Sequence, residues 1–123
     1  MTCFWDSIIR GLEWKPTNPA FFIEHLKSQN RETVSVVVND KPLTDLEKKE
    51  NFEAIRELRL ENGYLCSTSD PVLCLVSELF QIQVVHTMNG CKTVYRFRDC
   101  PPEKSLHLTS SKSHCSLSKK VEN

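Results

Sequence analysis

A β-hairpin is predicted by the stretch Gln81-Ile82-Gln83-Val84-Val85-His86-Thr87-Met88-Asn89-Gly90-Cys91-Lys92-Thr93-Val94-Tyr95-Arg96-Phe97-Arg98. Its Asn89-Gly90 dipeptide suits a two-residue type I′ turn, because both central residues of that turn need a positive φ. Such a turn places Met88 opposite Cys91 and Val84 opposite Tyr95. In that register four apolar residues share one face, so strand pairing and burial agree; they are Ile82, Val84, Tyr95 and Phe97.

The chain after the hairpin predicts a third strand. Pro101-Pro102 ends the second hairpin strand, because proline cannot donate to a central ladder. Ser105 to Thr109 then alternates, with Leu106 and Leu108 on one side, which is the period of a half-buried strand. We expect this strand to extend the sheet as an antiparallel β-meander.

The C-terminal end is predicted to be less ordered. A polar turn over residues 110–113 leads to His114-Cys115-Ser116-Leu117, and from Ser118 on we expect a frayed tail. At 123 residues the chain has the length of one domain. We therefore expect a single domain over residues 1–117 and a disordered tail over residues 118–123.

Two helices are predicted at the start of the chain. The first covers about Cys3 to Leu12, where apolar residues recur on one helical face. The second begins at Pro19, after the capping residue Asn18, and runs to about Gln29. A turn or loop joins them, because proline at position 16 does not continue a helix.

Two further helices precede the hairpin. Thr44 and Glu47 form a capping box, which opens a helix of about 15 residues that ends before Asn62-Gly63. A last helix begins at Pro71 and ends near Phe80. It is apolar on nearly every side, so we expect it in the interior.

The order of these elements predicts the fold class. A run of β-branched residues from Thr33 to Val38, between the second and third helices, indicates a strand or an extended segment. Helices otherwise come first and strands last. We therefore expect an α+β fold in which N-terminal helices pack on a small antiparallel β-meander.

Composition argues against several classes of partner. Sixteen basic and sixteen acidic side chains give a net charge of zero, which disfavours nucleic acid. No segment approaches the roughly 20 apolar residues of a membrane span, and the N-terminus lacks the pattern of a secretory signal. We expect a soluble, cytoplasmic monomer with neither nucleic acid nor a membrane as its partner.

Neither a cofactor nor a metal is indicated. The three glycines are scattered, so no glycine-rich phosphate loop exists, and no two histidines lie at metal-ligand spacing. No two of the six cysteines form a C-x-x-C pair, which argues against structural zinc and disulfides. Most of them are interpreted as small buried apolar residues, above all Cys74 within an apolar run.

Cys3 differs from the other cysteines because it stands at the start of the first predicted helix. The free N–H groups and the positive dipole end of a helix stabilise a thiolate, which is the nucleophilic form of cysteine. Such a nucleophile needs a base, which the fold can bring from a distant part of the chain. The histidines available are His25, His86, His107 and His114.

Several motifs taken together resemble the OTU-type, papain-like cysteine proteases. Cys3-Phe4-Trp5-Asp6-Ser7-Ile8 resembles the family's cysteine motif, in which the nucleophile begins a core helix and an aromatic or aliphatic residue follows it. Later motifs are similar to the family's order of parts: Asn62-Gly63-Tyr64, the helix from Pro71, the strand Ile82-Gln83-Val84-Val85, and Leu106-His107-Leu108 before a polar turn and His114. The resemblance covers nearly the whole chain, and the small size suits the compact viral members.

The resemblance implies an OTU/papain-like fold and a cysteine protease or deubiquitinase. Cys3 would be the nucleophile, and His114 would be the general base that takes its proton and later protonates the leaving amine. The implied substrate and partner is the C-terminal tail of ubiquitin or of a ubiquitin-like protein, or a viral polyprotein junction. A viral member would act in the host cytoplasm.

An alternative of another class stays open. The family often has an aspartate three positions before the cysteine, in a loop that binds the oxyanion, but only Met1 and Thr2 precede Cys3. The orienting acid or amide expected two residues after His114 is Ser116. These departures favour, as the alternative, a catalytically inactive module of the same fold that binds ubiquitin or another partner protein.

Overall fold

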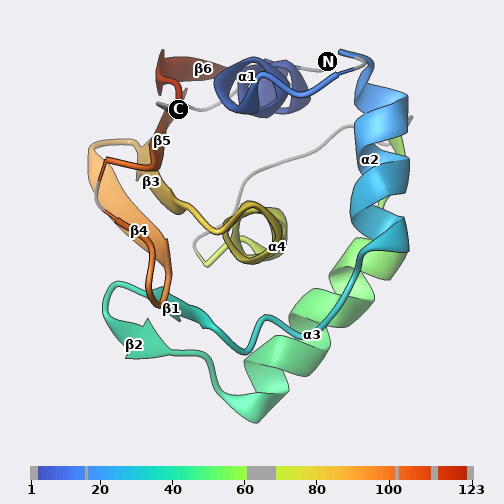
Figure 1. Cartoon of the computed structure of the whole chain (residues 1–123), viewed down its shortest axis with the longest axis vertical. Coiled ribbons are helices and arrows are strands. Elements are labelled where there is room, and N and C mark those ends of the chain that lie inside the picture. The colour runs from blue at the N-terminus through green and yellow to red at the C-terminus, as the bar shows by residue number, and fades with distance from the viewer. Residues whose placement is uncertain (1–2, 16, 61–68, 102, 112–113, 122–123) are drawn as a thin grey trace.

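The structure, a computed structural model, describes residues 3–15, 17–60, 69–101, 103–111 and 114–121. Within these ranges the chain forms four helices and six strands (Figure 1). The helices are α1 (Cys3–Leu12), α2 (Pro19–Ser28), α3 (Asp45–Arg56) and α4 (Pro71–Phe80). The strands are β1 (Val36–Val38), β2 (Lys41–Pro42), β3 (Gln83–Met88), β4 (Cys91–Phe97), β5 (Ser105–Ser111) and β6 (His114–Lys119).

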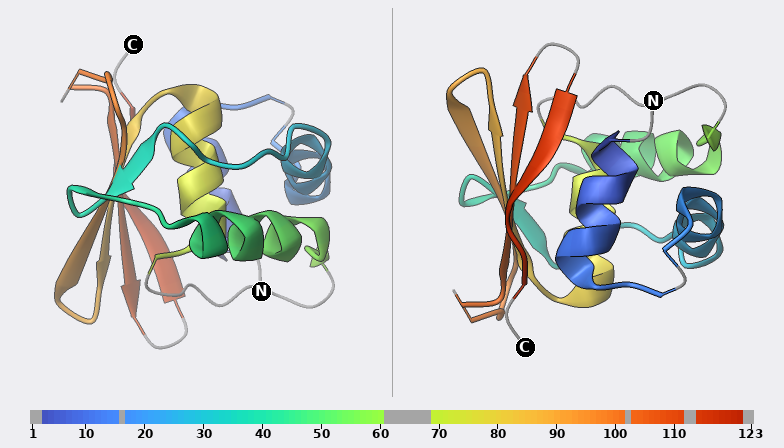
Figure 2. Two further views of the ribbon diagram at one scale, coloured as in Figure 1. Left: turned by 90° about the horizontal axis from the view of Figure 1, so that it is seen from below. Right: turned by 90° about the horizontal axis from the view of Figure 1, so that it is seen from above.

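The described helices all lie on one side of the sheet (Figure 2). α1 packs directly on β5 and β6, and α4 packs on β1, β3 and β4. α2 and α3 form an outer layer, in which α2 contacts α1 and α3 contacts α4. The molecule is thus a mixed α and β fold with helices packed on one face of a sheet, as the order of elements predicts.

Capping side chains explain where the helices begin. The Asn18 side chain accepts a hydrogen bond from Ala20 N at 2.8 Å at the start of α2. In α3, Thr44 Oγ1 accepts from Glu47 N at 3.1 Å and the Glu47 carboxylate accepts from Thr44 N at 2.9 Å, which is the predicted capping box. Asp70 caps α4 through its own side chain. The predicted starts of these helices are confirmed.

α3 is shorter than predicted. It ends at Arg56 after 12 residues. The Leu58 N–H then donates to Ile55 O at 3.2 Å, an i to i+3 bond of the kind that tightens the end of a helix. The predicted end of the helix before Asn62-Gly63 lies outside the described residues. So do Tyr64 and Cys66.

The predicted hairpin is present as β3 and β4. Met88 pairs with Cys91 and Val84 pairs with Tyr95, as the two-residue turn requires. The turn has a positive φ at both central positions, 51° at Asn89 and 84° at Gly90. The predicted register is confirmed. Of the predicted apolar face, Ile82, Val84 and Tyr95 are buried and Phe97 is partly buried.

The β-branched run before α3 forms a strand over only part of its length. β1 covers three residues, pairs with β4, and turns into β2 through Asn39 and Asp40, which both have a positive φ. The Asn39 side chain also accepts a hydrogen bond from Val94 N at 2.9 Å. β1 therefore occupies the edge of β4 that the hairpin leaves open.

The prediction of an antiparallel meander is wrong at β5. This strand lies beside β3 and runs parallel to it, and the sheet order is β2-β1-β4-β3-β5-β6. Because β1 pairs with one edge of β4, the hairpin edge left for β5 is that of β3. The chain from β4 passes the start of β3, where Gln83 N donates to Lys104 O at 2.9 Å. The periodicity of the sequence does not predict this pairing. It indicates which face of the sheet each side chain lies on, but not which strand lies beside it.

The chain beyond Ser118 is held by α1, where a frayed tail is predicted from the sequence. β6 continues to Lys119, and Val121 N donates to Gly11 O at 3.0 Å. Lys120 Nζ lies 2.9 Å from Glu13 Oε1 just after α1. These contacts join the two ends of the described chain, so they leave no local pattern in the sequence.

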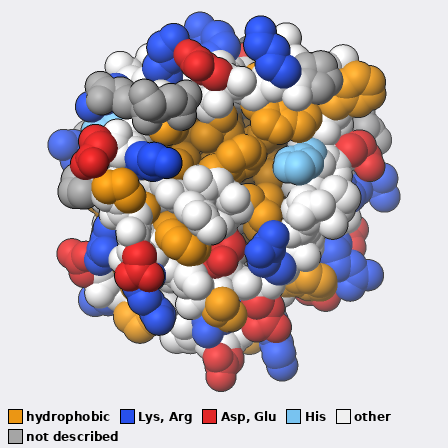
Figure 3. Space-filling view, in the orientation of Figure 1, with side chains coloured by type: hydrophobic (Ala, Val, Ile, Leu, Met, Phe, Trp, Pro, Cys, Tyr) orange, Lys and Arg blue, Asp and Glu red, His pale blue; other side chains and the backbone are white. Residues whose placement is uncertain are grey.

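Aromatic side chains connect the inner and outer helices. The Phe22 ring on α2 lies 6.3 Å from the buried Trp5 ring on α1 and 5.0 Å from the Trp14 ring. It also stacks on Phe80 of α4 at 6.4 Å. On the face viewed in Figure 3, hydrophobic side chains reach the surface in the middle, between the sheet and α2, with charged side chains around them. The core therefore extends through both helical layers.

α1 approaches the sheet closely because Gly11 carries no side chain. A Cβ at this position would overlap Leu106 Cδ1 of β5 and would lie 2.9 Å from Leu117 Cδ1 of β6. Ile8, one turn earlier, is completely buried. The glycine thus determines how deeply α1 sits against the end of the sheet.

Gly11→Ala is expected to destabilise the protein by about 1–3 kcal/mol, because the added methyl group pushes the Leu106 and Leu117 side chains away from α1. Helix propensity alone predicts the opposite, a gain of roughly 1 kcal/mol. Urea unfolding measures the change, with Glu24→Ala on the exposed side of α2 as a control that shifts stability by less than about 0.5 kcal/mol. A Gly11→Ala protein as stable as the wild type would contradict the close packing of α1.

His86 is a buried histidine in the middle of the sheet. Its side chain is 1% exposed, and its Nε2 lies 2.7 Å from Ser110 Oγ. Burial lowers the pKa of His86 below its ordinary value, because the interior disfavours the charged ring. The residue is therefore neutral in the folded protein at neutral pH, and its role is structural.

The free energy of unfolding is expected to decrease as the pH falls below about 6.5, the ordinary pKa of histidine. In that range the unfolded chain binds a proton at His86 that the folded chain does not bind, so this contribution to stability rises with pH, by at most about 1.4 kcal/mol per pH unit. Urea unfolding at a series of pH values measures the slope. His86→Gln removes the titration and should flatten it; an unchanged slope would show that other groups cause the acid sensitivity.

Candidate functional site

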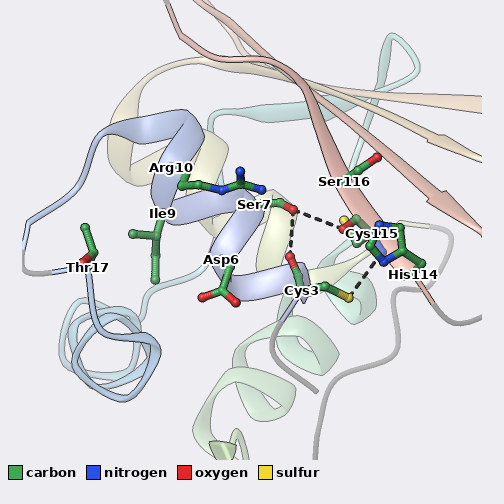
Figure 4. Close-up of a pocket in the computed structure, with 9 residues that line it drawn as sticks. All are labelled: Cys3, Asp6, Ser7, Ile9, Arg10, Thr17, His114, Cys115 and Ser116. Atoms are coloured by element: carbon green, nitrogen blue, oxygen red, sulfur yellow. Dashed lines mark hydrogen bonds between the residues drawn. The ribbon is translucent and has the colours of Figure 1, made fainter.

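The candidate site lies where the start of α1 meets the start of β6 (Figure 4). Cys3 is the first described residue of α1, and its Sγ accepts a hydrogen bond from Cys115 N at 3.3 Å. These two residues are 112 positions apart in the sequence. The fold therefore brings the N-terminal cysteine against the strand that carries His114.

A surface pocket of about 550 Å³ surrounds this junction. Cys3 and His114, the two site residues predicted from the sequence, both line it. The other lining residues come from α1, the segment before α2, and β6: Asp6, Ser7, Ile9, Arg10, Thr17, Cys115 and Ser116. A thiol and an imidazole thus share one solvent-accessible cavity.

His114 is the first residue of β6, and its side chain is exposed. Side chains alternate along a strand, so His114 and Ser116 lie on the side of β6 opposite to the buried Cys115. Within the described residues, no hydrogen bond joins the His114 ring to Cys3 Sγ. The exposed ring therefore lies outside the core.

The other histidines lie away from the pocket. His25 on α2 sits between the rings of Trp14 and Phe80, at 5.5 and 6.5 Å. His86 is buried in β3, and His107 lies on β5, where burial, Lys119 and Lys92 lower its pKa. Of the described histidines, His114 is therefore the one that could serve Cys3 as a base.

Ser116 does not orient His114 in this structure. Its Oγ donates to Thr109 O on β5 at 3.4 Å, and Figure 4 shows its side chain pointing away from Cys3. The two residues before Cys3, where the family's oxyanion loop would end, lie outside the described residues. Of the groups that the resemblance implies, the described residues therefore include the cysteine and the histidine, with the main chain of Cys115 beside Cys3.

The structure adds a residue that the sequence reasoning did not select. Ser7 is completely buried, and its Oγ donates to Cys3 O at 2.7 Å and to Cys115 O at 3.3 Å. One signal could have revealed it: Ser7 is a hydroxyl residue one helical turn after Cys3 and one turn before Gly11, on the same side of α1. A polar group in such a position needs a hydrogen-bond partner.

Comparison of the chain with protein-family models, with curated proteins and with solved structures found no match. Among the residues that the structure describes, no group of three or more His, Cys, Asp or Glu is placed to hold a metal ion. No helix in the described ranges is long and apolar enough to cross a membrane. The chemistry of the site is therefore argued from the pocket itself.

Alkylation of the native protein is expected to discriminate between the cysteines. Cys91 is exposed and Cys3 opens onto the pocket, so both should react with iodoacetamide. Cys74 is completely buried, and burial, with Asp70 and Glu47 nearby, raises the pKa of its thiol to about 12. Peptide mass spectrometry should find Cys74 modified only after unfolding. Labelling of Cys74 in the folded protein would contradict the packing of α4.

Proposed function

We propose that this protein is a thiol-dependent peptide hydrolase, in which Cys3 is the nucleophile and His114 is the general base. A single observation carries the proposal: the cysteine that begins α1 and the histidine that begins β6 line the same pocket. The free N–H groups at the start of a helix add a second element, since they favour negative charge on sulfur and on a developing oxyanion.

The reaction uses these two side chains in turn. His114 accepts the proton of the Cys3 thiol as the sulfur attacks the scissile carbonyl carbon, and a tetrahedral oxyanion forms. The C–N bond then breaks, and the leaving amine takes the proton from His114. Water, deprotonated by His114, attacks the thioester carbonyl carbon; the C–S bond then breaks, and the Cys3 sulfur takes the proton back from His114 as the carboxylic acid leaves. These reaction steps require one conformational change, a rotation of the exposed His114 ring toward Cys3 Sγ.

The substrate class follows from the resemblance to OTU-type proteases. It is the C-terminal tail of ubiquitin or of a ubiquitin-like protein, or a viral polyprotein junction. The pocket supports an extended peptide in one respect: it is a surface pocket lined by both Cys3 and the start of β6, so a peptide can reach Cys3 without passing through a tunnel.

A ubiquitin probe with a C-terminal electrophile tests the proposal. The wild type is expected to form a covalent adduct, Cys3→Ala to form none, and His114→Ala to react about 100–10,000 times more slowly, because the general base is lost. Cys91→Ala and His107→Ala are the matched controls, since neither residue lines the pocket. An adduct that survives Cys3→Ala would overturn the assignment of the nucleophile.

A second candidate function is a non-catalytic module that binds ubiquitin or another partner protein. It is favoured by the state of the site: within the described residues no hydrogen bond joins the His114 ring to Cys3 Sγ, and Ser116 turns toward Thr109. Calorimetric titration with free ubiquitin distinguishes the two functions. Binding that is unchanged by Cys3→Ala, together with no probe adduct, supports the module; rapid adduct formation excludes it.

A further inference from the structure

Ser7 joins the two segments that carry the site. Its side chain is 0% exposed, and its Oγ donates to two carbonyl oxygens, Cys3 O at 2.7 Å and Cys115 O at 3.3 Å. The first bond stays within the opening turn of α1. The second crosses to β6 at the residue that follows His114. Figure 4 shows both bonds at the back of the pocket.

The main chain of Cys115 is held from α1 at both of its polar groups. Its N–H donates to Cys3 Sγ at 3.3 Å, and its carbonyl accepts from Ser7 Oγ. In the described part of the chain β6 is the last strand of the sheet, and no further described strand pairs with its outer edge. α1 takes that place through two side chains spaced one helical turn apart. The start of β6 is therefore docked on α1 by these hydrogen bonds.

We infer that Ser7 is a positioning residue for the reaction proposed above, and the inference rests on that proposed function. Ser7 sets the distance between Cys3 and His114 because its hydroxyl binds the carbonyl of Cys3 and the carbonyl of Cys115, the residue after His114. It does not touch the substrate or the reacting atoms. Misplacement of a reacting group by about 1 Å can cost on the order of a hundredfold in rate, so a small displacement of β6 is sufficient to affect the site.

The chain offers a matched control for this role. Ser77 on α4 is also 0% exposed, and its Oγ donates to a main-chain carbonyl, Ile82 O, at 2.7 Å. Ser77 does not line the pocket. Ser7→Ala and Ser77→Ala therefore remove the same chemical group from equally buried positions, and only the first lies between Cys3 and His114.

The experiment measures the rate of adduct formation with the ubiquitin electrophile probe between about pH 6 and pH 9, together with the melting temperature of each variant. Both alanine variants should melt at lower temperature than the wild type. Ser7→Ala should also react about a hundredfold more slowly, and the acidic limb of its rate profile should move to higher pH, because His114 no longer assists Cys3. Ser77→Ala should keep the rate and the profile of the wild type.

Ser7→Thr retains the hydroxyl and should keep at least about a third of the wild-type rate, which also decides the question if Ser7→Ala does not fold. Equal rates and profiles for folded Ser7→Ala and Ser77→Ala would overturn the positioning role alone. A folded Ser7→Thr protein that has lost its reactivity would overturn it as well. A wild-type protein that forms no adduct would instead overturn the proposed function, and the inference with it.

Discussion

The docking of α1 on the end of the sheet is the constraint on which the rest of the structure depends. Gly11 lets the helix approach Leu106 and Leu117, and Ser7 and Cys3 bind the main chain of Cys115. One helix thereby covers the apolar face of β5 and β6 and also occupies the polar edge of β6. The unpaired N–H and C=O groups of a strand edge can pair with another chain, and here a helix satisfies part of that edge.

The parallel placement of β5 beside β3 has a consequence for the site. It leaves β6 as the last strand, at the end of the sheet that α1 covers. In a simple meander β5 would pair with β4, and β6 would follow it to a different edge, away from α1. The pairing of β1 with β4 excludes that arrangement. The pocket between Cys3 and His114 therefore depends on a strand of only three residues, far from the pocket.

Local patterns predicted the helices and the hairpin well because each of these elements is stabilised by neighbours in sequence. Asn18 and Thr44 cap their own helices, and Asn89-Gly90 specifies its own turn. The site was predictable to a smaller extent. Cys3 stood out by its place at a helix start and His114 by a resemblance, but nothing in the motif around Cys3 assigned a role to Ser7. Its role depends on a strand more than a hundred residues away, which a local pattern cannot contain.

The sequence by itself determined the helical and extended segments, the hairpin register, and the two side chains to which the proposed chemistry is assigned. Caps, turn residues and periodic burial act over a few residues, so they can be predicted from the sequence before the fold is known. Only the tertiary structure decided the neighbours of β5, the docking of residues 118–121 on α1, and the meeting of Cys3 with the strand of His114. These features arise from competition between distant segments for one apolar face and for the free strand edges, and that competition is settled only when the whole chain packs.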